Sequence, residues 1–119
     1  MAAPNLFRPA SVTAKNAKAA ITTSSTAIIS NAAESGKTLR VTSLYISNID
    51  GTDSAAVTVD IFDGTHARHL AKTVAVPADA TLTVITREDA VYLTEGDSLR
   101  LSASAENDLE AVASYEEIA

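Results

Sequence analysis

The feature that most constrains this chain is a series of short segments in which apolar and polar residues alternate. Residues 55–62 show it best, since Val57, Val59 and Ile61 alternate with polar residues. A period of two places the apolar side chains on one face of a β-strand. Comparable segments follow roughly every 8–12 residues, the spacing of a sandwich or barrel, and helical periodicity is nowhere sustained. The sequence therefore predicts an all-β domain.

Turn residues separate about eight predicted strands, which together predict a single antiparallel β-sandwich of jelly-roll type. The dipeptides Asp50-Gly51 and Asp63-Gly64 are both strong hairpin signals. Within residues 38–48 the apolar positions change parity, and this change indicates a bend, a bulge or a passage between sheets. The predicted strands cover residues 21–30, 38–48, 55–62, 66–76, 81–86, 91–93, 98–104 and 109–118.

The first 18 residues lack this alternation, so we predict an extended N-terminal arm over residues 1–18 and a β-sandwich domain over 19–119. Pro4 and Pro9 disfavour a regular element, and only the short Ala-rich stretch 14–20 has some helical character. Leu6 and Phe7 are expected to dock on their own domain or, as we favour, on a neighbouring chain. The candidate partner contacts are Pro4, Leu6, Phe7, Arg8, Pro9, Lys15 and Lys18.

The charge is negative overall and unevenly distributed. A net charge of −6 argues against a nucleic-acid partner, because phosphate contacts need a basic face. Residues 1–40 hold five Lys or Arg against one Glu, a charge of +4, so the rest of the chain carries −10. This asymmetry allows head-to-tail contact between copies or docking on another acidic surface. Simple solvation of the charges has equal weight.

Composition narrows the class of protein further. Hydrophobic residues make up 46% of the chain but aromatic residues only 4%, so the core side chains are small and we expect help from partner subunits. The absence of Cys excludes disulfides and Cys-based zinc sites. Without a signal-peptide pattern or an apolar run of about 18 residues, we expect a soluble protein made in the cytoplasm, with no membrane partner.

No group of residues predicts catalysis, a cofactor or a metal site. His66 and His69 are three positions apart, so on a strand they face opposite ways. The oxygen-rich segment 48–53 lacks EF-hand spacing, and its Asp-Gly is explained by a turn. The acidic pairs 88–89 and 116–117 are sequence neighbours and cannot form a dyad on a strand. Nucleophile-elbow and phosphate-binding patterns are missing, so an enzyme is not expected.

Three segments together resemble small virion structural proteins of tailed bacteriophages, a group common in phages of marine bacteria and cyanobacteria. The segments are LYISNIDGTDSAAVTVD (44–60), LAKTVAVPADATL (70–82) and YLTEGDSLRLSASAENDLEA (92–111). The resemblance covers roughly residues 20–118 and implies a virion component made in the host cytoplasm. It implies as partners other copies of the chain and other virion proteins, the major capsid protein among them.

A capsid decoration or cement protein that bridges subunits is the favoured role, because an arm can add contacts across a joint. Analogy with cement proteins suggests a homo-oligomer, for example a trimer. The alternatives are a neck or tail accessory or fibre-attachment protein and, from another class, a carbohydrate-binding β-sandwich module. The last would need an exposed aromatic platform. Its candidates are Tyr45, Tyr92 and Tyr115, of which Tyr45 and Tyr115 are expected in the core.

Overall fold

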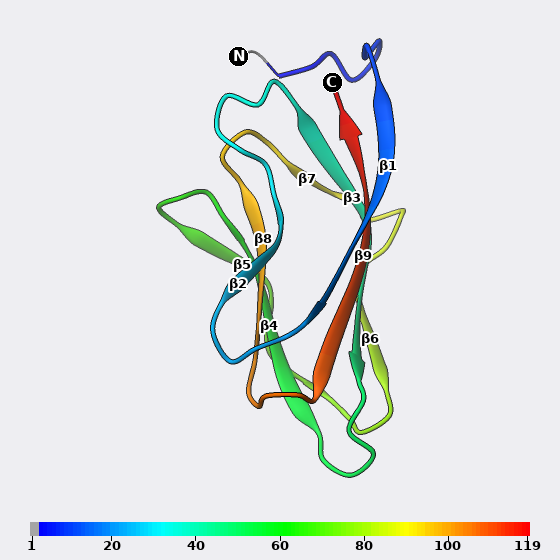
Figure 1. Ribbon diagram of the computed structural model, residues 1–119, viewed down its shortest axis with the longest axis vertical. Coiled ribbons are helices and arrows are strands. Elements are labelled where there is room, and N and C mark those ends of the chain that lie inside the picture. The colour runs from blue at the N-terminus through cyan, green and yellow to red at the C-terminus, as the bar shows by residue number, and fades with distance from the viewer. Residues whose placement is uncertain (1–2) are drawn as a thin grey trace.

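The computed structural model describes residues 3–119 and contains two antiparallel β-sheets packed face to face (Figure 1). No helix occurs in this range. The nine strands are β1 (Val12–Ala20), β2 (Thr26–Ser30), β3 (Thr38–Asn48), β4 (Ala55–Phe62), β5 (Ala67–Val76), β6 (Thr81–Ile85), β7 (Val91–Leu93), β8 (Ser98–Ala103) and β9 (Leu109–Ile118). The molecule is elongated, with extents of 48 × 27 × 19 Å.

The strand order is that of a jelly roll. The first sheet runs β1-β9-β3-β6, with β7 also paired to β3, and the second runs β2-β8-β4-β5. The chain crosses repeatedly from one sheet to the other, and β6 and β7 share the place of one strand beside β3. This is the double Greek-key arrangement of eight-stranded jelly rolls. The predicted antiparallel sandwich is therefore confirmed.

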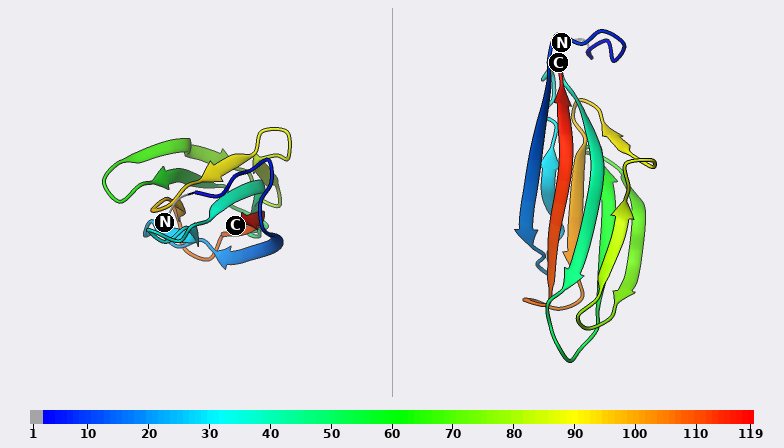
Figure 2. Two further views of the ribbon diagram at one scale, coloured as in Figure 1. Left: turned by 90° about the horizontal axis from the view of Figure 1, so that it is seen from above. Right: turned by 90° about the vertical axis from the view of Figure 1, so that its right-hand side faces the viewer.

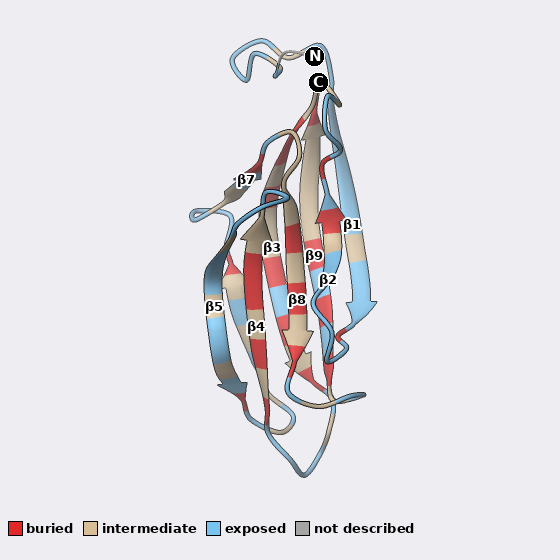
Figure 3. Ribbon diagram, turned by 90° about the vertical axis from the view of Figure 1, so that its left-hand side faces the viewer, coloured by how far each residue is buried: buried red, intermediate tan, exposed pale blue. Residues whose placement is uncertain are grey.

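The core lies between the two sheets and consists of aliphatic residues. The buried residues lie on strands of both sheets (Figure 3). Leu44 and Ile46 of β3 pack with Leu99 of β8 and Val57 of β4, and all four are fully buried. Two buried asparagines fasten the crossings between the sheets. Asn31 Nδ2 donates to the carbonyls of Lys37 and Leu93, and Asn48 Nδ2 donates to those of Asp53 and Val76. Within residues 3–119, no buried side-chain polar atom lacks a hydrogen bond.

The parity change predicted in residues 38–48 is a β-bulge. The register between β3 and β9 shifts between Val41 and Ser43, so that Thr42 is the extra residue. Leu39 and Val41 point inward before the bulge, and Leu44 and Ile46 point inward after it. An extra residue reverses the alternation of a strand, and β3 can therefore cover the core along its whole length.

The two Asp-Gly signals have different outcomes. Asp63-Gly64 joins β4 to β5 as a hairpin, with Gly64 at φ 97°. The hairpin prediction for Asp50-Gly51 is wrong, because β3 and β4 belong to different sheets. Gly51 does not have the positive φ of a two-residue hairpin turn. Instead Asp50 Oδ1 accepts the Thr52 N–H at 2.8 Å, which shapes an inter-sheet loop.

The N-terminal boundary differs from the one that the sequence suggested. Residues 12–20 form β1, which pairs without interruption with β9 from Val12↔Ile118 to Ala20↔Glu110. Only residues 3–11 of the predicted arm precede the first strand, and residues 1–2 lie outside the described range. The helical character of residues 14–20 is not realised. Most β1 side chains are exposed on both faces, so this strand carries no apolar–polar alternation.

Candidate assembly surface

The N-terminal segment, residues 3–11, projects from the end of the sandwich where the C-terminus also lies (Figure 2). Backbone bonds anchor its base, since Ala10 N–H donates to Ala119 O at 2.7 Å and Ala119 N–H donates to Ser11 O at 2.9 Å. Beyond this anchor, Phe7 is 92% exposed and Leu6 is 49% exposed. These two apolar side chains are thus held out in solvent rather than packed on their own domain.

The candidate contact residues from the sequence do not form one patch. Leu6, Phe7 and Arg8 are exposed on the projecting segment, and Pro4 and Pro9 are half-buried there. Lys15 and Lys18 lie on β1, where a spacing of three places them on opposite faces of the first sheet. The structure therefore brings together the candidates of residues 4–9 and separates them from the two lysines.

Much of the positive charge of residues 1–40 is neutralised by ion pairs with acidic residues of the same chain. Glu117 lies between two cations, with Oε2 at 3.0 Å from Lys15 Nζ and Oε1 at 3.2 Å from Lys37 Nζ. Glu116 accepts a hydrogen bond from Arg40 Nε at 2.7 Å. The C-terminal strand thus forms ion pairs with basic residues of the positively charged region 1–40. Because these ion pairs form within one chain, the electrostatic argument for head-to-tail contact between copies is weaker.

The two lysines make the Glu117 carboxyl sensitive to acid. The hydrogen bond from Lys15 stabilises the carboxylate and lowers the pKa of Glu117, although partial burial opposes the shift. A lowered pKa adds stability that is complete above the unfolded value, about 4.3, and disappears as pH falls through the folded value. We expect Glu117→Gln to cost up to about 1 kcal/mol at pH 7.

Urea unfolding at pH 7 and at about pH 3 measures this effect. The difference between wild type and Glu117→Gln should shrink at the lower pH. Glu110→Gln, at an exposed position of the same strand, is the matched control and should change little at either pH. A wild-type advantage that persists undiminished in acid would contradict the assigned role of the carboxylate.

The outer face of the first sheet exposes two neighbouring apolar side chains. Tyr45 is 44% exposed and Val112 is 46% exposed, and the two are paired across β3 and β9. The expectation that Tyr45 lies in the core is wrong, because the bulge at Thr42 reverses the alternation and turns Tyr45 outward. Tyr115, by contrast, packs against the core as expected.

The exposed tyrosines do not form a stacking platform. Tyr92 is 46% exposed and pairs with Arg40, five positions before Tyr45 on β3. At about 3.4 Å per residue the two rings are attached roughly 17 Å apart. A sugar ring could stack on one of them but not on both, so this arrangement gives little support to a carbohydrate-binding module.

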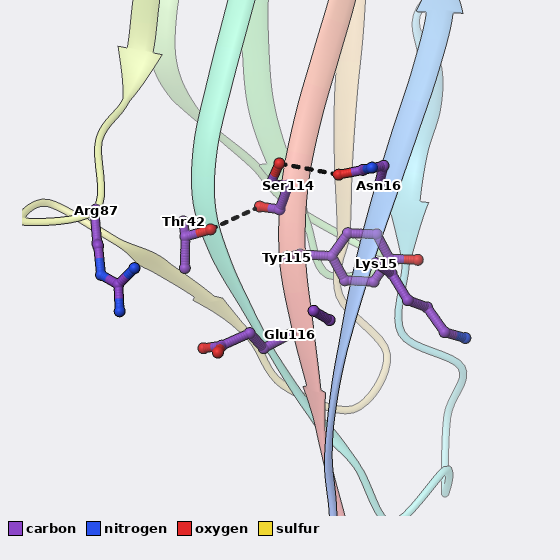
Figure 4. A pocket seen from close by; sticks show the side chains of 8 residues that line it. Lys15, Asn16, Thr42, Arg87, Ser114, Tyr115 and Glu116 are labelled. Atoms are coloured by element: carbon purple, nitrogen blue, oxygen red, sulfur yellow. Dashed lines mark hydrogen bonds between the residues drawn. The ribbon is translucent and has the colours of Figure 1, made fainter.

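A shallow pocket opens on the first sheet beside the loop between β6 and β7 (Figure 4). Most of its polar side chains are already bonded within the protein. Ser114 Oγ lies 3.1 Å from Asn16 Oδ1, and Thr42 Oγ1 donates to Ser114 O at 3.2 Å. The rest of the lining consists of Ala14, Lys15, Arg87, Tyr115 and Glu116. This lining pairs no nucleophile with a general base.

The histidines and carboxylates considered in the sequence analysis lie in turns or on the faces of the sheets, where they make structural contacts. The His66 N–H donates to Asp63 Oδ1 in the β4–β5 turn, whereas His69 lies on β5 opposite Asp60. Asp60 itself pairs with Arg100, at 2.8 Å from Oδ1 to Nε, and the guanidinium lies 4.0 Å from the Phe62 ring centroid. Across residues 3–119 no three His, Cys, Asp or Glu side chains gather as a metal site would require. This range also has no helix long and apolar enough to cross a membrane.

Comparison with known proteins identifies the fold. No protein-family model and no curated protein sequence matches the chain. Among solved structures, a chain in the acidic stable capsid structure of Helicobacter pylori bacteriophage KHP30 superposes with a TM-score of 0.57 at 10% identity, covering 94% of this chain and 90% of that one. This sandwich and a capsid chain therefore share their fold.

Two further structures show a weaker similarity. Both are crystal structures of a pentameric capsid protein isolated from metagenomic phage sequences, with a TM-score of 0.43 and 17% identity. They match 87% of this chain and 60% or 61% of their own.

Proposed function

We propose that this chain is a structural protein of a bacteriophage particle, in which it decorates the capsid and cements neighbouring subunits. The fold shared with a chain of the KHP30 capsid supports a place in a virion. The observation that carries the cementing role is the projecting Leu6-Phe7 pair, which is anchored beside Ala119 and not covered by its own domain.

The geometry suits a bridge between two subunits. A sandwich with a core of interlocked aliphatic side chains keeps its shape under load, while the segment ahead of Ala10 extends past its end. Burial of Leu6 and Phe7 in a neighbour would contribute about 1.5–3 kcal/mol for each side chain. One copy can then rest on one subunit and anchor in the next, and many copies add their contacts over the head.

The role is mechanical and requires no cofactor. Its proposed partners are the major capsid protein and other copies of the chain, within a virion that is assembled after synthesis in the host cytoplasm. The net charge of −6 disfavours binding of the protein to the packaged nucleic acid.

Particle dissociation and labelling test the proposal. After mild dissociation the chain should separate with the heads, and labels on intact particles should mark many positions over the head surface. A single labelled ring at the head–tail junction would assign the chain to the neck instead. Recovery with tails alone, or absence from purified particles, would refute the cementing role.

A further inference from the structure

The four sheet edges differ in how well they are protected against pairing with another strand. In the second sheet, β2 is short and has a register shift between Ala27 and Ile29, and β5 has two shifts and a Thr73 at φ 51°. In the first sheet, the edge opposite β1 is broken into β6 and β7 by residues 86–90. Short strands, bulges, breaks and charged side chains such as Lys are devices that blunt a sheet edge.

The edge strand β1 is neither short, bulged nor broken, and Lys15 and Lys18 are its only protective residues. It extends over nine residues without a register shift, contains neither Pro nor Gly, and lies exposed along the margin of the molecule (Figure 3). Such an edge is a template for pairing with another strand. Of the four sheet edges, β1 is thus the longest uninterrupted one and the best suited to pair with another strand.

The backbone groups that face the open edge can be assigned. Ser11 and Ala119 exchange both of their N–H···O bonds, and the Ile21 N–H donates to Leu109 O. Partners alternate along an antiparallel strand, so the odd-numbered residues of β1 bond to β9. The even-numbered residues then direct N–H and C=O groups to the open side. These residues are Val12, Ala14, Asn16, Lys18 and Ala20.

We propose that β1 pairs antiparallel with β1 of a second copy, about a two-fold axis that passes between the two Asn16 residues. This register joins all nine residues of both strands and forms about ten backbone hydrogen bonds. The axis stands perpendicular to the sheets, so the outer faces of the two copies remain on the same side. The two first sheets thereby become one continuous sheet.

The positions of the two lysines favour a second copy as the partner and the register centred on Asn16. With Asn16 on the axis, Lys15 lies opposite Ala17, and Lys18 lies opposite Ala14 of the other copy. A register centred on either lysine would place like charges directly opposite, which is destabilising. A register centred on Ala17 would leave Val12 and Thr13 unpaired. The strand is therefore complementary to itself, with a small side chain facing each lysine.

This pairing rests on the proposed function and deepens it, because it names a second copy of the chain as a neighbour of the cement protein. It is a two-fold contact, in contrast to the trimer suggested by analogy. The projecting segment stays available for another subunit, because it lies ahead of Ala10, outside the paired residues.

Light scattering coupled to gel filtration measures the mass of the purified full-length chain. A dimer of about 25 kDa is expected, twice the chain mass of 12.3 kDa. Asn16→Pro should halve that mass, because Pro removes an N–H that faces the partner but leaves the backbone bonds to β9 intact; the side-chain bond from Ser114 is lost in this variant and in Asn16→Ala alike. Asn16→Ala keeps the N–H and should remain dimeric. A monomeric wild type, or a dimer that survives Asn16→Pro with the fold verified by circular dichroism, would overturn the proposal.

Single cysteines test the register independently of proline. The chain has no Cys of its own, and Asn16→Cys would place two thiols on the axis, within reach of a disulfide. Lys18→Cys is the matched control on the same exposed face, and its two thiols would lie too far apart to bond. Oxidation should crosslink the first variant and spare the second, and the opposite result would refute the register.

The two proposals fail separately. Wild-type chains that remain monomeric in solution yet cover phage heads would remove the β1 pairing and leave the cementing role. Chains that dimerise through Asn16 but are absent from heads would support the β1 pairing and refute the cementing role.

Discussion

A chain that lacks residues 1–10 is expected to fold like the full-length protein and to lose its attachment to the phage head. The deletion retains Ser11 and all nine strands and removes one backbone bond, from Ala10 to Ala119, so the unfolding midpoint should change little. It removes Leu6 and Phe7, whose joint burial is worth about 3–6 kcal/mol at about 1.5–3 kcal/mol each. A loss of that size lowers affinity at least about 100-fold. The amount of truncated chain bound to purified particles measures this loss of affinity.

The cut must fall before β1. A deletion up to residue 18 would remove most of that strand and the Lys15 partner of Glu117, so a loss of attachment could then reflect a damaged sheet. In the full-length chain, Leu6→Ser with Phe7→Ser should reproduce the deletion, whereas Arg8→Ser, at an exposed neighbouring position, should retain most of the attachment. Normal occupancy of heads by the truncated chain would show that the segment is not the connector.

Replacement of Leu44 by Ala should destabilise the fold more than any change on the surface of β3. Leu44 is fully buried and lies directly after the bulge, between Ala113 of β9 and Ile85 of β6. Truncation of a buried Leu costs about 2–5 kcal/mol because it leaves a cavity. For a domain with a stability of roughly 5–15 kcal/mol, the midpoint of thermal unfolding should fall by about 10 °C or more.

The next residue supplies the matched control. Tyr45 is 44% exposed on the outer face, so Tyr45→Ala should cost less than about 1 kcal/mol although it removes a larger side chain. Urea and thermal unfolding of both variants would measure the contrast. Equal losses, or a larger loss at Tyr45, would mean that the bulge at Thr42 does not set the alternation of this strand.

Much of the fold follows from patterns that lie within single strands. The alternation in residues 55–62 and 98–103 matches the buried faces of β4 and β8, because a strand with one buried face has a period of two. The change from Leu39 and Val41 to Leu44 and Ile46 indicated a bend, a bulge or a passage between sheets for the same reason, and the structure has a bulge. The Asp63-Gly64 hairpin was also predictable, since its turn joins two adjacent strands of one sheet.

The strands that cover the core, and the kind of sandwich they build, follow from the amino-acid pattern alone, because burial of one face leaves a local signature. Three features are visible only in the folded molecule: residues 12–20 form a strand, Asp50-Gly51 crosses between sheets, and Glu117 binds Lys15 from the other end of the chain. The physical reason is that an edge strand exposed on both faces has no alternation to detect. Pairing between distant segments likewise depends on groups that are far apart in the sequence. The candidate assembly surfaces, the projecting Leu6-Phe7 pair and the open edge of β1, belong to this second class.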